Sequence, residues 1–190
     1  MYDAPVTGVY LVGLRGTGKT TLGRRLAEEM AMDFVDLDEV VEERAGKPAG
    51  EVIDSEGVEA FRAAEAEALE SMLGDIEDGG AVLALGGGAA ESPRVEDVLY
   101  GLRGLGWRGV WLVVHPNELV RRLRRSGVRR PRLCGRSVEE EIRVLASRRA
   151  SLFARLSDVR FDNTDEDVDR QATALLEVLG PLRDPPGAEI

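Results

Sequence analysis

Cysteine, histidine and long hydrophobic runs are scarce or missing in this chain of 190 residues. The single cysteine, Cys134, rules out an internal disulfide framework and fits the reducing cytoplasm. No apolar run approaches the roughly 18 to 20 residues that a membrane-spanning helix needs. The first eight residues have neither a basic start nor an apolar segment, so we expect no export signal. The sequence therefore predicts a soluble, cytoplasmic, globular protein without a membrane partner.

Lysine is also scarce, because only Lys19 and Lys47 are lysines among the 25 basic residues. Arginine supplies the positive charge elsewhere, so the presence of a lysine at position 19 indicates that a compact ammonium is needed there. The net charge is −10, yet residues 28–78 carry 18 acidic residues against 3 basic ones, and residues 100–160 carry 15 arginines against 5 acidic residues. Two solvated faces of opposite sign would explain this distribution, and so would an arginine-rich wall of an anion-binding site.

Short apolar runs alternate with helical stretches along the chain, and the length fits one domain. The predicted strands are 9–13, 34–38, 81–85, 110–114 and 159–163, and the predicted helices are 19–31, 56–73, 117–125, 137–156 and 166–179. This alternation favours βαβ units, with ligands bound at the carboxyl ends of parallel strands. We expect a single α/β domain over residues 1–180, with three α/β/α layers around a central parallel five-stranded sheet, and a frayed tail at 181–190.

The stretch "VGLRGTGKTTLG", residues 12–23, lies between a predicted strand and a predicted helix and contains the pattern G-x-x-x-x-G-K-[ST]. Backbone N–H groups of such a loop and the helix N-terminus bind phosphate. Lys19 would reach the β- and γ-phosphates, and the Thr20 hydroxyl would bind Mg²⁺. The alternative is a glycine-rich turn with a solvated Lys19. We predict a domain of the P-loop NTPase type whose ATP-binding residues are Gly13, Gly16, Thr17, Gly18, Lys19, Thr20 and Thr21.

Two aspartates, Asp36 and Asp38, end the second predicted strand, where alternation would put both side chains on the same side. Near bound ATP, one carboxylate can hold the metal shell and the other can accept a hydrogen bond from an attacking hydroxyl. Alternatively, one or both cap a helix that begins near Glu39.

Arg62 lies on a predicted helix that is crowded with acidic residues, so Glu59 or Glu65 could pair with it within the helix. A ligand-binding role for this arginine is the competing interpretation. The third predicted strand is followed by three consecutive glycines at 86–88, which permit close approach of a ligand to the backbone. They favour a binding floor at this position.

The motifs "GLRGTGKTTLGRRLA", "FVDLDEVVE", "EAFRAAE", "LALGGGAA", "RRPRL" and "RRASLFARLSD", in this order, resemble a bacterial shikimate kinase over residues 8–180. The phosphate loop alone is shared by many unrelated enzymes, whereas the ordered set is far more specific. The resemblance implies transfer of the γ-phosphoryl group of ATP to the 3-hydroxyl of shikimate, with Mg²⁺, in aromatic amino acid biosynthesis. It also implies a substrate-binding helical segment at about 37–65 and a lid at about 121–137.

The resemblance further implies roles for single residues. Asp36 would help to hold Mg²⁺ through water, and Asp38 would bind the shikimate hydroxyls and orient the attacking one. Arg62 and Arg149 would clamp the carboxylate, and Arg130 would reach ATP and the transferring phosphate from the lid. The expected catalytic residues are thus Lys19, Asp38 and Arg130, the metal-binding residues are Thr20 and Asp36, and the substrate-binding residues are Asp38, Arg62, Gly86, Gly87, Gly88 and Arg149.

Residues 121–136 contain eight arginines and two glycines, as a lid that closes over a phosphoryl group would need. Nucleic acid is a rival ligand, but no aromatic residue interleaves this run to stack bases, and the whole chain is acidic. We therefore expect no nucleic-acid partner. The expected partners are ATP and shikimate, and the expected assembly is a monomer.

Two other functions stay open on the sequence. A related kinase for another polyol acid, such as gluconate, should lack the joint set of Asp38, Arg62 and three glycines. A nucleotide-binding regulator without catalytic activity would be free to lose Asp38 or Arg130.

Overall fold

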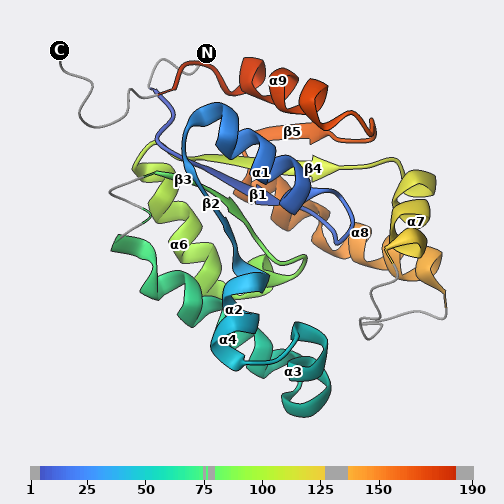
Figure 1. Ribbon diagram of the computed structural model, residues 1–190. Helices are drawn as coiled ribbons and strands as arrows, with labels where there is room; N and C mark the ends of the chain where they lie inside the picture. The colour runs from blue at the N-terminus through green and yellow to red at the C-terminus, as the bar shows by residue number, and fades with distance from the viewer. Residues whose placement is uncertain (1–4, 75, 77–79, 127–136, 183–190) are drawn as a thin grey trace.

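The computed structural model describes residues 5–74, 76, 80–126 and 137–182. Its centre is a parallel sheet of five strands, in the order β2-β3-β1-β4-β5 (Figure 1). The strands are β1 Val9–Val12, β2 Asp33–Asp36, β3 Ala81–Ala84, β4 Arg108–Val113 and β5 Val159–Asp162. The predicted α/β class with a five-stranded parallel sheet is confirmed.

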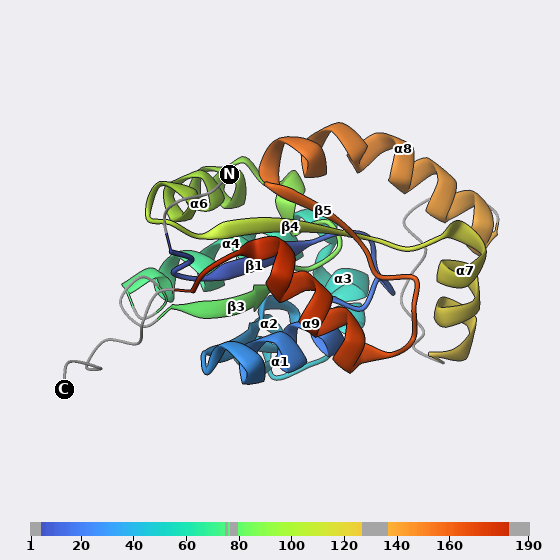
Figure 2. The same ribbon diagram turned by 90° about the horizontal axis from the view of Figure 1, so that it is seen from above.

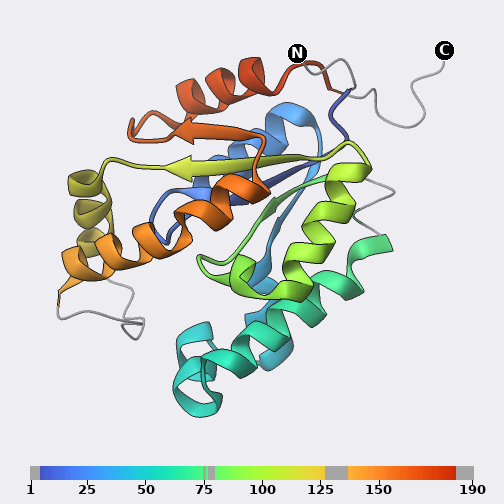
Figure 3. The same cartoon turned by 180° about the vertical axis from the view of Figure 1, so that it is seen from behind.

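Helices cover both faces of the sheet. They are α1 Lys19–Met30, α2 Leu37–Ala45, α3 Ala49–Glu56, α4 Val58–Ser71, α6 Pro93–Gly104, α7 Pro116–Arg125, α8 Val138–Leu156 and α9 Val168–Leu179, with the short 3₁₀ helix η1 Ala89–Glu91. Figure 2 shows α1 and α9 on one side of the sheet and α6 and α8 on the other. Figure 3 shows the second face, where α4, α6 and α8 form the outer layer. The domain therefore has the expected three α/β/α layers.

The position of β1 at the centre of the sheet explains why its sequence is apolar at every residue. Val9 and Leu11 pack into the core beneath α1 and α9, whereas Tyr10 and Val12 pack into the core beneath α4, α6 and α8. All four side chains are buried, because side chains of a strand alternate between faces and both faces carry helices.

The second strand ends two residues earlier than predicted. The Asp36 carboxylate accepts a hydrogen bond from the Asp38 backbone N–H at 3.0 Å and so caps helix α2, which begins at Leu37. Asp38 lies in the first turn of this helix. The prediction that both side chains share one side of an extended strand is wrong, and the capping alternative is right for Asp36.

The sequence patterns missed helix α6 and the short 3₁₀ helix η1. Helices α2 and α3 fall within the expected helical segment 37–65. Two residues of the expected tail at 181–190 pair with the N-terminal segment: the carbonyl of Pro181 accepts a hydrogen bond from Val6 N–H at 2.9 Å, and Leu182 forms a bridge with Val6. Residues 183–190 lie outside the described residues.

The expected lid at about 121–137 begins within helix α7 and ends just before α8. Residues 127–136, with Arg130 and Cys134, lie outside the described residues, so the lid and the role of Arg130 stay predictions from sequence. Within the described ranges, no helix combines the length and hydrophobicity that crossing a membrane requires.

Candidate active site

A cavity of about 890 Å³ opens at the carboxyl ends of the strands, and we call it the large cavity. The phosphate loop, the start of α2, the glycines after β3, helix α7 and the segment after β5 all contribute to its walls. Of the predicted ATP-binding residues, Gly16, Gly18, Lys19, Thr20 and Thr21 line it, together with Asp36, Asp38, Gly86, Gly87, Arg122, Arg125, Asn163, Asp165 and Glu166. Gly13 and Thr17 belong to the same loop but do not line the cavity.

The loop presents the N-terminus of α1 to the large cavity. Gly18 caps α1 with a φ of +92°, a left-handed conformation that glycine adopts without strain, and Gly13 and Gly16 also have positive φ. No side chain in the described ranges caps α1, and its first turn holds no acidic residue. The first backbone N–H groups of α1 can therefore bind an anionic ligand.

Lys19 is buried against the phosphate loop. Its Nζ donates to the backbone carbonyls of Gly13 and Leu14, at 3.0 Å each. The alternative of a solvated Lys19 is therefore wrong. The two carbonyls that hold the ammonium at the loop are neutral acceptors. Negatively charged phosphate oxygens accept more strongly and can replace them.

Asn163 is a residue of this site that the sequence patterns did not single out. It follows β5, is buried, and donates from Nδ2 to the backbone carbonyl of Thr17 at 2.8 Å. A side chain on Gly18 would collide with this amide, since a Cβ there would lie 2.5 Å from Nδ2. Asn163 thus fixes the loop from a strand that is remote in sequence. A polar residue at the carboxyl end of a predicted strand was the available signal.

Thr20 and Asp36 meet at the edge of the large cavity. The Thr20 hydroxyl donates to Asp36 Oδ2 at 2.6 Å, while Oδ1 accepts the helix-capping bond described above. Burial raises the pKa of Asp36 above its ordinary value, the hydrogen bond from Thr20 opposes this rise, and the negative charge of Asp38 adds to it. A cation beside this carboxylate would relieve both effects.

A second cavity, of about 60 Å³, adjoins the first, and we call it the small cavity. Its walls come from the phosphate loop, α2, α3, α4, the glycines after β3, and α8. Its lining residues are Leu14, Arg15, Asp38, Ile53, Phe61, Arg62, Gly87, Gly88, Glu141, Ile142, Leu145 and Arg149. Arg15, Asp38 and Gly87 line both cavities, so these three residues mark the junction between them.

Two arginines converge in the small cavity. A Cβ on Gly88 would collide with Nη2 of Arg62 and lie 2.8 Å from Nη2 of Arg149, so both guanidinium groups reach the same point of the floor. Arg62 also forms the expected ion pair with Glu65. It lines the small cavity as well, so pairing within the helix does not prevent it from facing a ligand.

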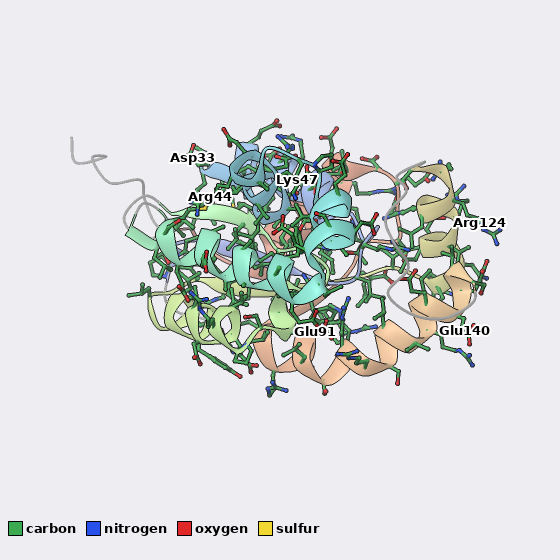
Figure 4. The ribbon with its side chains drawn as sticks, turned by 90° about the horizontal axis from the view of Figure 1, so that it is seen from below. Asp33, Arg44, Lys47, Glu91, Arg124 and Glu140 are labelled. Atoms are coloured by element: carbon green, nitrogen blue, oxygen red, sulfur yellow. The ribbon has the colours of Figure 1, made fainter. Side chains whose placement is uncertain are left out.

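Arg149 is held by groups that the sequence patterns did not connect. Its Nη1 donates to the Gly87 carbonyl at 2.7 Å, and its Nη2 pairs with Glu91 at 2.6 Å. Figure 4 labels Glu91, which lies beside helix α8. The Nε of Arg149 is buried without a hydrogen-bond partner among the residues that the structure describes. Buried polar groups normally have partners, so one donor of this guanidinium is unused within the described residues.

Gly86 forms the floor below Asp38. A Cβ there would collide with Oδ1 of Asp38 and Oε1 of Glu65, so any larger residue would displace both carboxylates. Gly87 packs against the phosphate loop, since its Cβ would lie 3.1 Å from the Arg15 backbone nitrogen. Without side chains, the three glycines let the backbone after β3 approach the carboxylates, the guanidinium groups and the phosphate loop of the site.

The site therefore combines a phosphate-binding loop with an adjoining pocket that holds two guanidinium groups and a carboxylate. A sequence model described as "Shikimate kinase" matches residues 15–180. The chain belongs to the shikimate kinase family. A shikimate kinase of Mycobacterium marinum (strain ATCC BAA-535 / M) is 41% identical over 152 residues, which are 80% of this chain and 78% of that relative.

Solved structures agree with this family. The shikimate kinase from Acinetobacter baumannii in complex with shikimate superposes with a TM-score of 0.80 at 27% identity, covering 92% of this chain and 93% of that one. The shikimate kinase from Bacteroides thetaiotaomicron superposes with a TM-score of 0.77 at 29% identity, covering 91% and 98%. The chain is thus an ATP-dependent kinase of the shikimate kinase family, and its P-loop fold is confirmed.

Proposed function

We propose that the chain transfers the γ-phosphoryl group of ATP to the 3-hydroxyl of shikimate, with ATP in the large cavity and shikimate at the junction, its carboxylate in the small cavity. The observation that carries this proposal is the convergence of Arg62 and Arg149 on Gly88, in a pocket that shares Asp38 with the large cavity. Shikimate is a small monoanion with three hydroxyls. Two guanidinium groups suit its carboxylate, and a carboxylate and backbone groups suit its hydroxyls.

Asp38 is the group placed to act on the attacking hydroxyl. It lies at the junction, between the cavity that holds the phosphate loop and the pocket that holds the two arginines. With the acceptor's carboxylate bound at Arg62 and Arg149, its ring carries the hydroxyls toward this junction. Asp38 orients the 3-hydroxyl and accepts its proton as the oxygen attacks phosphorus.

Lys19 and the start of α1 hold the phosphates. The Lys19 ammonium exchanges its carbonyl partners for phosphate oxygens, and the N–H groups after Gly18 bind further oxygens. These contacts neutralise charge that develops on the transferring and leaving groups. Asn163 keeps the loop in shape through its bond to Thr17.

The residues fit a magnesium ion at Thr20 and Asp36. A hydroxyl and a carboxylate, 2.6 Å apart, are the hard oxygen ligands that Mg²⁺ prefers. The ion would take its other ligands from phosphate and water. When bound, Mg²⁺ supplies positive charge to the phosphates.

The assembly and location follow from sequence alone. We expect a monomer in the cytoplasm, because the chain carries one cysteine and a net charge of −10 that keeps copies apart. Size-exclusion chromatography with light scattering tests the monomer directly.

A coupled assay of ADP release tests the acceptor. The purified chain with Mg²⁺ and ATP is given shikimate, quinate or gluconate at equal concentrations. We expect turnover with shikimate to exceed that with the other acids by at least about 10²-fold, because the two arginines and Asp38 act on one molecule. Preferred turnover of gluconate, or ADP release that no acceptor stimulates, would overturn the proposal.

A further inference from the structure

Arg15 is a residue of the phosphate loop to which neither the motif nor the proposed mechanism gives a role. In the described residues, Lys19, Arg122 and Arg125 line only the large cavity, and Arg62 and Arg149 line only the small one. Arg15 is the one basic residue of those ranges that lines both. Because the phosphoryl group passes from one cavity to the other, the Arg15 guanidinium lies where that group arrives.

Arg15 is fixed in place from the opposite wall. Its Nη2 pairs with Oε2 of Glu141 at 2.6 Å, and the Glu141 side chain is only 2% exposed whereas that of Arg15 is 29% exposed. Glu141 lies at the start of α8, the end that the labelled Glu140 marks in Figure 4. A buried carboxylate needs a cation, so the pair holds the Arg15 guanidinium across the junction.

The pair leaves Arg15 with donors for a ligand. A guanidinium has five N–H groups, and the bond to Glu141 uses Nη2. The remaining donors have the fork geometry that matches phosphate oxygens.

We propose that Arg15 binds the phosphoryl group once it has reached the acceptor, and that Glu141 is its positioning residue. This inference rests on the proposed acceptor. In the transfer, the bond between the γ-phosphorus and the ADP oxygen breaks and its electron pair leaves with ADP. The 3-oxygen supplies the pair for the new bond to phosphorus, and its proton passes to Asp38.

The product makes the need for Arg15 clear. A phosphate ester at the 3-oxygen places a dianion close to Asp38, and once Asp38 has released the proton that it accepted, like charges at such a distance destabilise each other. Lys19 faces the nucleotide side, whereas Arg62 and Arg149 face the carboxylate of the acceptor. Arg15 supplies the positive charge at the point where the dianion forms.

The test compares the affinities of three ligands for the full chain: shikimate, ADP and shikimate 3-phosphate, each by isothermal titration. In Arg15→Met, we expect the affinity for shikimate 3-phosphate to fall about 10- to 100-fold, as for the loss of a charge-assisted hydrogen bond. The dissociation constants of shikimate and ADP should change less than about 3-fold. The turnover number should fall with the affinity for the ester.

Two further variants separate binding from structure. Arg15→Met leaves Glu141 buried without this partner, so the double variant Arg15→Met/Glu141→Gln removes both charges and protects the fold. It should show the same selective loss as Arg15→Met. Glu141→Gln alone keeps the cation but loosens it, so it should weaken the ester less than Arg15→Met does. The two losses should not add, because both act through one guanidinium.

The control is the Arg24–Glu39 pair, which joins α1 to α2 with the same separation of 2.6 Å but lines neither cavity. Arg24→Met should leave all three affinities unchanged. An equal loss for shikimate and its phosphate ester, a comparable loss for ADP, or no loss in either Arg15 variant would overturn the inference. A wild-type chain that binds neither shikimate nor its ester would overturn the proposed function itself.

Discussion

The neighbouring residues Arg148 and Arg149 allow a matched test of the acceptor clamp. Both arginines pair with Glu91, at 3.1 and 2.6 Å, and both lie on α8. The Arg149 side chain is 4% exposed and lines the small cavity, whereas that of Arg148 is 70% exposed and does not. Replacing arginine by lysine keeps the positive charge at both positions and removes the guanidinium fork at both. Only at Arg149 does that fork face the small cavity, where a carboxylate would bind.

The expected effect of Arg149→Lys is a higher KM for shikimate at saturating ATP. Lysine cannot make the two parallel bonds of a guanidinium, and the bond to the Gly87 carbonyl at 2.7 Å is also lost. A hydrogen bond between charged groups contributes about 1.5–3 kcal/mol, so KM should rise about 10- to 100-fold. The turnover number should change much less, since the carboxylate is bound in ground state and transition state alike.

Initial rates over a range of shikimate concentrations measure both constants. Arg148→Lys should change KM by less than about 3-fold, because exposed ion pairs contribute about 0–1 kcal/mol. Equal changes in the two variants would refute the clamp. So would a fall in turnover number at unchanged KM, because it would place Arg149 at the transferring group.

Further variants test the other assignments. Lys19→Arg should lower turnover by about 10²-fold or more, since a planar fork does not fit a loop made for a compact ammonium; an activity near that of the wild type would contradict this. Asp38→Asn should lower turnover by about 10²- to 10⁴-fold at any Mg²⁺ concentration, whereas added Mg²⁺ should partly restore Asp36→Asn; the opposite pattern in a Mg²⁺ titration would exchange the two roles. Without Mg²⁺, the raised pKa of Asp36 means that its contribution to stability is present in acid and is lost as the pH rises through that pKa. Asp36→Asn should thus raise the melting temperature of the metal-free protein at pH 7 more than at pH 4, and an equal shift at both would argue against a buried charge. Asn163→Ala should cost about 1–3 kcal/mol in the free energy of unfolding, because the Thr17 carbonyl loses its buried donor, and denaturant titration measures this.

The sheet could be predicted from sequence because its central strands are buried on both faces. Four buried residues in β1 and four in β3 give short, continuous apolar runs with glycine or charge at their ends. The predicted end of the second strand was wrong because the Asp36 side chain accepts a backbone hydrogen bond and starts helix α2 at that point. Helix α6 was missed because Gly101 and Gly104 weaken its helical pattern. A Cβ would meet no atom at either glycine, so packing does not require them. Val95, Leu99 and Leu102 are buried, so tertiary packing stabilises this helix despite local preference.

The site divides in the same way between local and distant contacts. The phosphate loop is a contiguous motif, so its spacing alone predicted where Lys19 would lie. The pair between Arg15 and Glu141 joins residues 126 positions apart, and the bond from Asn163 to Thr17 spans 146 positions. A single sequence carries no spacing rule for such contacts, because only the crossover connections of the sheet bring their elements together.

Two interpretations of the uneven charge were solvated surface faces and an arginine-rich wall of an anion-binding site. Each holds for different arginines. On α7, Arg121 pairs with Glu118 and Glu166 on the surface, as solvated faces would. Arg122 and Arg125 line the large cavity as well as pairing with acidic residues, and Arg149 lines the small one. A net charge of −10 would repel ATP at long range, but salt screens charges beyond about 8–10 Å. Within that distance the local charges decide the potential. Three arginines face two carboxylates in the small cavity, and four basic residues balance four acidic ones in the large cavity, where the N-terminus of α1 adds positive potential. An acidic chain can therefore still bind two anionic substrates side by side.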